Sequence, residues 1–146
     1  MTTIISLMIA CLIVLLSGCS VEKDDNFKIG VSQCSSDAWR TKMNEEMMRE
    51  AMLSHDISLE IRSAGDESFI QCDDINYFIK KKVDLLIVAP NEAGEVTPAV
   101  NKAYDAGIPV IVVDRNVDDD KYTASVRADN VHIGKLQAQY IMSRLK

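Results

Sequence analysis

The sequence predicts an α/β fold built on an open, mostly parallel β-sheet with helices on both faces. Strand-like and helix-like patterns alternate along the chain, and two short apolar runs occur at residues 83–89 and 108–113. Runs of this kind are typical of parallel strands that are covered on both faces. The predicted strands begin near positions 27, 57, 83 and 109, and this spacing matches the length of a βα unit. The alternation of the two element types favours a parallel sheet.

The first two predicted strands, residues 27–31 and 57–61, alternate apolar and polar side chains. Period-two alternation indicates a strand with one wetter face. Between them, residues 36–54 repeat apolar side chains every three to four positions, and this spacing predicts an amphipathic helix. Ser36 and Asp37 are both residue types that cap a helix N-terminus, so the chain is expected to enter a helix directly after its first strand.

The remainder of the chain repeats this pattern. A second helix is expected after Asp66, and residues 92–106 are expected to form a third helix that ends at Gly107, a residue type that favours helix termination. Residues 122–128 are predicted to form a fifth, shorter strand. A last helix is expected from Asn130, and its apolar residues are Ile133, Leu136, Tyr140, Ile141 and Leu145.

The N-terminal segment, residues 1–19, contains no Asp, Glu, Lys or Arg. Its apolar run over residues 4–16 is shorter than the about 20 residues that cross a bilayer. A run of this length matches the hydrophobic core of a secretory signal peptide. The run ends in Ser17, Gly18 and Cys19, and two small residues before a cysteine resemble a bacterial lipobox.

That resemblance implies cleavage before Cys19 and a lipid on Cys19 that anchors the protein to a membrane. An uncleaved N-terminal membrane anchor is the alternative. Under either interpretation, residues 20–26 are a polar spacer, and residues 27–146 form one exported domain on the periplasmic side or at the cell surface. Outside the leader only Cys34 and Cys72 remain; we expect them to be unpaired, with a disulfide as the alternative.

The composition of the chain and the motifs that it lacks argue against several classes of function. The chain carries 16 Lys and Arg against 22 Asp and Glu, a formal charge of −6, which argues against binding to nucleic acid. No glycine-rich phosphate loop follows the first predicted strand, and the sequence lacks a P-loop lysine motif, a G-x-S-x-G elbow and a zinc-type Cys/His spacing. The sequence therefore favours a binding module without cofactor or metal over an enzyme.

Polar loops are expected at the carboxyl edge of the predicted sheet, where open α/β sheets bind ligands. Asp accepts hydrogen bonds, Arg donates through a planar fork, Asn does both, and Trp can cover an apolar C–H face. This combination suits a small, neutral, polyhydroxylated ligand. The candidate ligand-binding residues are Ser36, Asp37, Trp39, Arg40, Asn91, Asp114, Arg115 and Asp129.

Several of these candidates have structural alternatives. Asp114 and Arg115 could form a local ion pair or a cap, and Trp39 could belong to the hydrophobic core. Asp129 is also well placed to cap the last predicted helix. Sequence alone leaves these alternatives open.

Residues 27–146 resemble the N-terminal lobe of a type I periplasmic sugar-binding protein of the ribose-binding kind. The most specific match is the stretch Ile-Pro-Val-x-x-x-Asp-Arg over residues 108–115, followed by an Asp-Asn pair at residues 129–130. The resemblance implies that Asp114 and Arg115 bind sugar hydroxyls together with side chains after the first strand. Residues 36–39 read Ser-Asp-Ala-Trp where ribose binders typically have Asn-Pro-Phe-Phe, so the identity of the sugar stays open.

The stretch over residues 32–47 is similar to the sensor domains of hybrid two-component regulators, in which a sugar domain precedes a transmembrane helix, a histidine kinase and a DNA-binding response domain. That resemblance implies that Asp37 and Arg40 join the ligand contacts, and that the protein is a homodimer if it belongs to a sensor kinase. A substrate-binding lipoprotein of a sugar ABC transporter and an exported α/β enzyme fragment are the alternatives. Because such receptors close two lobes on the ligand, the chain is interpreted as a truncated first lobe with little sugar affinity of its own.

Overall fold

The computed structural model describes residues 26–145 and contains one five-stranded sheet with the strand order β2-β1-β3-β4-β5. Every pair of neighbouring strands is parallel. The strands are β1 (Phe27–Gln33), β2 (Ile57–Ser63), β3 (Leu85–Ala89), β4 (Val110–Val113) and β5 (Ala124–Val126). The predicted leader with Cys19, and the spacer up to residue 25, lie outside the described residues.

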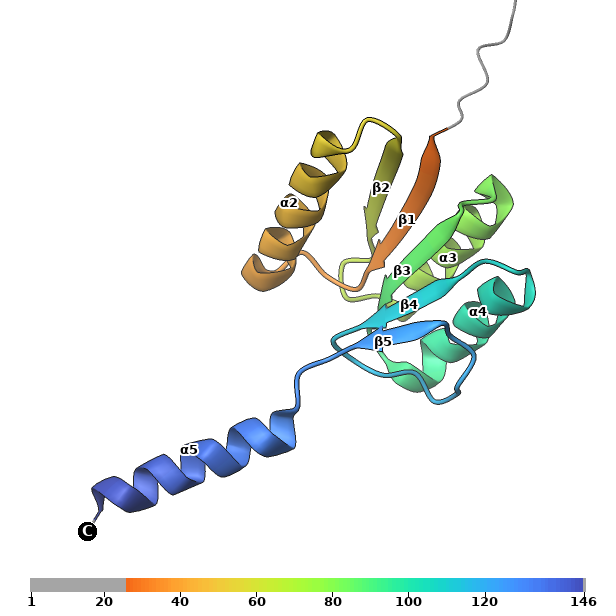
Figure 1. Ribbon diagram of the computed structural model, residues 1–146. Helices are drawn as coiled ribbons and strands as arrows, with labels where there is room; N and C mark the ends of the chain where they lie inside the picture. The colour runs from red at the N-terminus through yellow and green to blue at the C-terminus, as the bar shows by residue number, and fades with distance from the viewer. Residues whose placement is uncertain (1–25, 146) are drawn as a thin grey trace, which may run out of the picture.

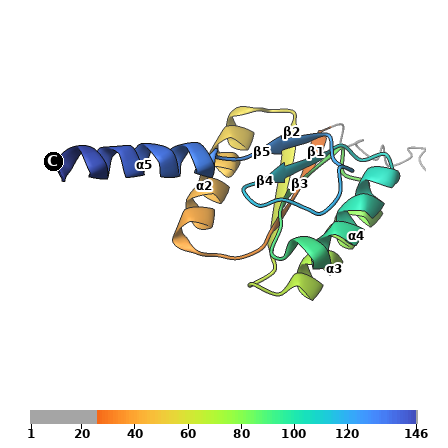
Figure 2. The same cartoon turned by 90° about the horizontal axis from the view of Figure 1, so that it is seen from below.

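Helices occupy both faces of this sheet, as predicted (Figures 1 and 2). The helices are α2 (Ala38–Leu53), α3 (Ser68–Lys81), α4 (Ala93–Asp105) and α5 (Asn130–Arg144). One face carries α2, the other carries α3 and α4, and α5 projects away from the sheet (Figure 2). Among the described residues, no helix has both the length and the apolar character needed to cross a membrane.

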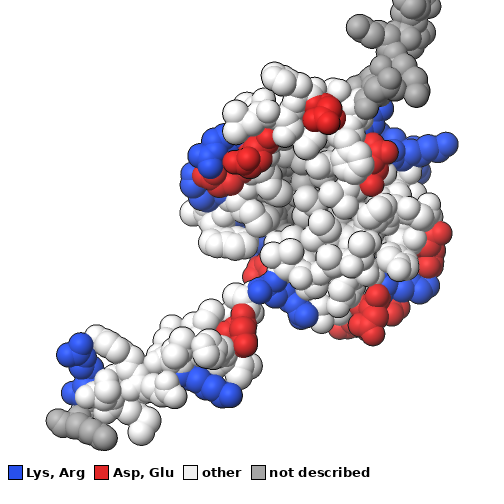
Figure 3. Space-filling model, viewed as in Figure 1, with Lys and Arg blue, Asp and Glu red and all other residues white. Residues whose placement is uncertain are grey.

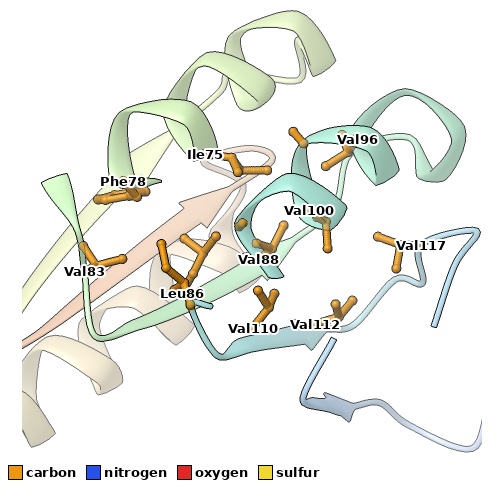
Figure 4. Close-up of a cluster of buried hydrophobic side chains, with 13 residues drawn as sticks. Ile75, Phe78, Val83, Leu86, Val88, Val96, Val100, Val110, Val112 and Val117 are labelled. Carbon is orange, nitrogen blue, oxygen red and sulfur yellow. The ribbon is translucent and has the colours of Figure 1, made fainter. Parts of the chain in front are cut away.

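The main hydrophobic core lies between the sheet and the pair α3 and α4 (Figure 4). Phe78 of α3 is fully buried and lies against β1 at Gly30, where a Cβ atom would come within 2.6 Å of the Phe78 ring. Leu86 and Val88 of β3 meet this core from the sheet, and each buried side chain of this size stabilises the fold by about 1.5–3 kcal/mol. The domain therefore holds its core within the described residues.

Two predicted helix caps are present. The Asp37 side chain accepts a hydrogen bond from the Arg40 backbone N–H at 3.0 Å, so Asp37 rather than Ser36 caps α2. The Asp129 side chain accepts from the His132 backbone N–H at 2.9 Å and caps α5. Each cap satisfies a backbone donor that the first turn of a helix leaves without a partner.

The structure differs from the prediction on one face of the sheet. We expected β3 and β4 to be covered on both faces, but only the face toward α3 and α4 is covered. On the α2 face, Ile87, Ile111 and Val113 stay partly exposed and Val126 of β5 is exposed. The reason is that α2 packs mainly over β2, while α5 leaves the sheet (Figure 1). Strand β5 is also shorter than the predicted 122–128.

Candidate functional site

The strand order reverses between β1 and β3, because β2 lies on one side of β1 and the strands β3 to β5 lie on the other. Open α/β sheets bind ligands at the carboxyl ends of the strands next to such a switch point. The loops that follow β1 and β3 flank this point, and the loop after β4 adjoins them. Most of the predicted ligand-binding residues therefore lie on one edge of the sheet.

Arg40 is the centre of a polar cluster at this edge. Its side chain is only 4% exposed, and its guanidinium contacts three side chains. Nη2 lies 2.9 Å from Oδ2 of Asp114, and Nε lies 3.3 Å from Oδ2 of Asp37. Nη1 donates to Oε1 of Gln33 at 3.2 Å. Buried charges are tolerated where they are paired and hydrogen-bonded, and this arrangement meets both conditions.

Gln33 extends the cluster beneath the loops. It is the last residue of β1, is fully buried, and donates from Nε2 to Oδ1 of Asn44 at 2.9 Å. Asn44 lies one helical turn after Arg40 on α2, so both side chains lie on the same face of that helix. The end of β1 and the start of α2 are therefore tied together by side chains as well as by the chain.

Asp114 combines an unusual backbone with an anchored carboxylate. Its φ is +68°, in the left-handed region, and its N–H donates to the carbonyl of Val126 at 2.9 Å. Non-glycine residues seldom adopt this conformation, and Asp is among those that tolerate it best. The side chain is held by Arg40 yet is 41% exposed, so it can accept further hydrogen bonds at the rim.

The carboxylate of Asp37, which also contacts Arg40, is held in its ionised form. Hydrogen bonds from the Arg40 backbone N–H and, at 2.7 Å, from the Ser35 hydroxyl hold the pKa of the Asp37 carboxyl below its ordinary value. The guanidinium of Arg40 acts in the same direction. Asp37 is therefore an ionised acceptor across the neutral pH range.

A second polar group lies on the other side of the switch point. The amide Nδ2 of Asn91 donates to the carbonyl of Asp66 at 2.9 Å and to the hydroxyl of Ser68 at 3.1 Å. Arg115 donates from Nη1 to the carbonyl of Asn91 at 2.8 Å. These contacts join the loops after β2, β3 and β4 into one polar rim.

Gln71 holds this rim from below. Its side chain is fully buried, and Nε2 donates to the carbonyls of Ala89 at 2.9 Å and Ser32 at 3.3 Å. Its Oε1 accepts from the backbone N–H of Asn91 at 2.8 Å. One side chain from α3 therefore fixes the carboxyl ends of β1 and β3 and the start of the next loop.

Trp39 stands at the open side of the cluster. It is 57% exposed, which rules out the core alternative, and it helps to line a hollow of about 260 Å³ with Asp114 and Val126. Ser36 is exposed nearby, and its hydroxyl lies 2.8 Å from that of Ser63. An exposed aromatic face beside an anchored carboxylate is suited to a ligand with both an apolar face and hydroxyls.

The structure thus brings most of the candidate residues together. Asp37, Trp39, Arg40 and Asp114 form one cluster, and Asn91 and Arg115 form the adjoining group. Asp129 is engaged as the cap of α5. Which of them touch a ligand stays a prediction.

Sequence reasoning missed the buried amides Gln33 and Gln71 and the half-buried amide Asn44 as parts of the site. A signal for Gln71 was present, because it precedes Ile75 by four positions and shares the buried face of α3. A polar residue on an apolar stripe must find buried partners, and such a residue can mark the base of a site.

Two further features do not belong to this cluster. A hollow of about 390 Å³ lies between α2 and the sheet, and Ile29, Met47 and Leu59 give it an apolar lining. Cys34 and Cys72 are free thiols, and burial raises the pKa of the Cys72 thiol. Within residues 26–145, no three His, Cys, Asp or Glu side chains are grouped so that they could hold a metal ion.

A family model described as a periplasmic binding protein domain matches residues 29–146. The chain belongs to this family. Members of this family are binding domains rather than enzymes, and they are located in the periplasm. The parallel sheet and the cluster at its carboxyl edge agree with this assignment.

Individual relatives are similar over most of the chain. The ribose import binding protein of Bacillus subtilis (strain 168) is 27% identical over 97% of this chain and 50% of its own length. The galactofuranose-binding protein of Escherichia coli (strain K12) is 31% identical over 80% of this chain and 38% of its own length. The chain therefore spans half or less of the length of these relatives.

A solved structure is also similar, with greater identity. It is the fructose-binding periplasmic domain of the hybrid two-component system BT1754, with 54% identity and a TM-score of 0.77. The match covers 82% of this chain and 40% of that chain. The similarity thus supports the same fold and the same family.

Proposed function

We propose that this chain is the N-terminal lobe of a periplasmic receptor for a monosaccharide. The observation that carries the proposal is the Asp114 carboxylate, which is fixed by the buried Arg40 and stays exposed beside the indole of Trp39. The carboxylate accepts hydrogen bonds from sugar hydroxyls, and the indole covers the C–H face of the ring. The guanidinium of Arg115, which is held by the Asn91 carbonyl, supplies further N–H donors at the adjoining rim.

Fructose is the first ligand to test. The support is the 54% identity with a solved domain whose name includes fructose binding, together with the Ser-Asp-Ala-Trp sequence at residues 36–39 in place of the run typical of ribose binders. Relatives named for ribose and galactofuranose make other sugars the natural comparison set.

The receptor that we propose is the sensor domain of a hybrid two-component regulator, which acts as a homodimer. Similarity to the BT1754 domain supports this assignment over a transporter lipoprotein. The ribose import relative keeps the transporter as the second candidate, and the lipobox-like end at Cys19 favours it. Loss of lipid labelling in a Cys19→Ala variant would support lipid attachment, and unchanged labelling would refute it.

The binding proposal can be tested by NMR titration of an isotope-labelled chain that begins at Ser20, because the described residues contain a buried hydrophobic core. With D-fructose in the millimolar range, we expect shifts at the Trp39 indole N–H and in the loops after β1 and β4. These shifts should vanish in Asp114→Ala and persist in Asp73→Ala, an exposed position on α3. No shift with D-fructose, ribose or galactofuranose, or equal shifts in both variants, would overturn the proposal.

A further inference from the structure

Arg40 is poorly placed to donate hydrogen bonds to a ligand beside Trp39. Its side chain is only 4% exposed, and its Nη2, Nε and Nη1 atoms already contact Asp114, Asp37 and Gln33. The guanidinium also lies 5.4 Å from the centre of the Trp39 ring. Arg40 therefore supports the side chains around it, and a ligand at this point needs a donor from another residue.

The hollow of about 260 Å³ beside Trp39 has one cationic side chain in its lining, that of Arg127. The polar part of the lining consists of Trp39, Asp114 and Arg127, and the remainder is apolar. Arg127 is exposed, and its side chain makes no hydrogen bond or ion pair within residues 26–145. The donors of its guanidinium are therefore available at the hollow, whereas those of Arg40 are engaged.

The sheet places Arg127 close to Asp114. Val113 at the end of β4 pairs with Val126 at the end of β5, and the Asp114 N–H donates to the Val126 carbonyl at 2.9 Å. Asp114 and Arg127 each follow a member of this pair, so they occupy neighbouring places at the carboxyl edge of the sheet. Figure 3 shows basic and acidic side chains next to one another where the domain meets α5. An anionic acceptor and a cationic donor are thus presented together at the hollow.

These two side chains complement the hydroxyl groups of a sugar. A hydroxyl has one O–H to donate and two lone pairs that accept. The Asp114 carboxylate can only accept, so it satisfies the O–H and leaves the lone pairs without a donor. Apart from the single N–H of the Trp39 indole, the side-chain donors of the lining belong to Arg127. Neighbouring hydroxyls of one sugar can therefore donate to Asp114 and accept from Arg127.

The formal charges also balance when Arg127 is included. Asp37 and Asp114 both contact Arg40, so two carboxylates share one cation. Arg127 supplies a second cation, which brings the formal charge of these groups to zero and suits a neutral ligand. We propose that Arg127 is a sugar-binding residue, which donates to a hydroxyl oxygen next to the hydroxyl that Asp114 holds. This assignment rests on the proposed binding of a monosaccharide and adds a ligand contact to it.

The first test is NMR titration of the wild-type chain from Ser20 with D-fructose, followed through the Nε–H signals of the arginine side chains. The Arg127 signal should shift as the sugar is added. The signal of Arg49, which is exposed on α2 and pairs with Glu46, should stay in place. A titration that shifts the Trp39 indole N–H and leaves the Arg127 signal unmoved would overturn the assignment.

The second test compares two arginine variants. Arg127→Ala should raise the Kd for D-fructose by about tenfold or more, because a hydrogen bond from a charged group is lost. Arg144→Ala, which removes an exposed arginine at the end of α5, should bind as the wild type does. The backbone amide spectrum of each free variant checks that it is folded.

The outcomes separate this assignment from the proposed function. If Arg127→Ala binds as tightly as the wild type while Asp114→Ala does not bind, the lobe binds sugar and the role of Arg127 is wrong. If the wild-type chain binds none of D-fructose, ribose and galactofuranose, the proposed function and the role of Arg127 are both overturned.

Discussion

Nη2 of Arg40 lies 2.9 Å from Oδ2 of Asp114, although the two residues are 74 positions apart in the sequence. The contact joins the first turn of α2 to the loop after β4 across the carboxyl edge of the sheet. Since Arg40 is buried and Asp114 is partly exposed, the arginine fixes the carboxylate from the protein side. The two residues therefore have different roles in the cluster.

Replacing Arg40 by Met should lower the free energy of unfolding by about 1–3 kcal/mol, because the buried Oε1 of Gln33 loses its donor. Urea denaturation measures the change. Arg49→Met is the matched control on the same helix, where the arginine is exposed and its pair with Glu46 is a surface pair. We expect the control to change stability by less than about 1 kcal/mol. Equal losses in the two variants would contradict the role assigned to Arg40.

Gln71→Leu should lower the free energy of unfolding more than Arg40→Met does, because three backbone groups lose a hydrogen-bond partner at once. Leucine cannot replace the hydrogen bonds that Gln71 makes to the carbonyls of Ser32 and Ala89 and to the N–H of Asn91. We expect this loss to cost about 3 kcal/mol. Chemical denaturation followed by circular dichroism measures this cost. Gln139→Leu, on an exposed part of α5, should stay within about 0.5 kcal/mol of the wild type. A neutral Gln71→Leu would show that these hydrogen bonds are replaceable.

Features that depend on residues close together in the sequence were predictable, and contacts between residues far apart in the sequence were not. The parallel sheet was predictable because the runs at residues 83–89 and 108–113 reflect local burial, and Asp114 was placed at the edge by the strand before it. The pairing of Arg40 with Asp114 was not predictable, because it depends on the order of the strands. The outward direction of α5 was likewise hidden, since an apolar stripe predicts burial but not the surface that provides it.

Gly30 and Phe78 should be coupled in stability. A Cβ on Gly30 would meet the Phe78 ring at 2.6 Å, so Gly30→Ala is expected to cost about 1–3 kcal/mol through overpacking. In a Phe78→Leu background the smaller side chain leaves room, and the added methyl should cost less. A double-mutant cycle by urea denaturation measures the difference. Additive costs would refute a direct clash between these two residues.

The last prediction concerns pH. Hydrogen bonds from the Arg40 backbone and the Ser35 hydroxyl favour the ionised form of Asp37 in the folded protein, so its pKa lies below the value in the unfolded chain, about 3.9. A depressed folded-state pKa gives stability that is present above the unfolded pKa and is lost as the pH falls through the folded pKa. Carboxyl-detected NMR titration should therefore give an Asp37 midpoint below that of an ordinary aspartate.

Ser35→Ala removes one of these donors and should raise the midpoint of Asp37 toward the ordinary value. Ser36→Ala is the matched control, because the hydroxyl of Ser36 contacts Ser63 instead of Asp37. The loss of stability on acidification should accordingly be smaller in Ser35→Ala than in the wild type and should be complete at a higher pH, while Ser36→Ala follows the wild type. Identical titration curves for the two variants would mean that the Ser35 hydroxyl does not stabilise the charge, and that the backbone N–H of the α2 cap does so without it.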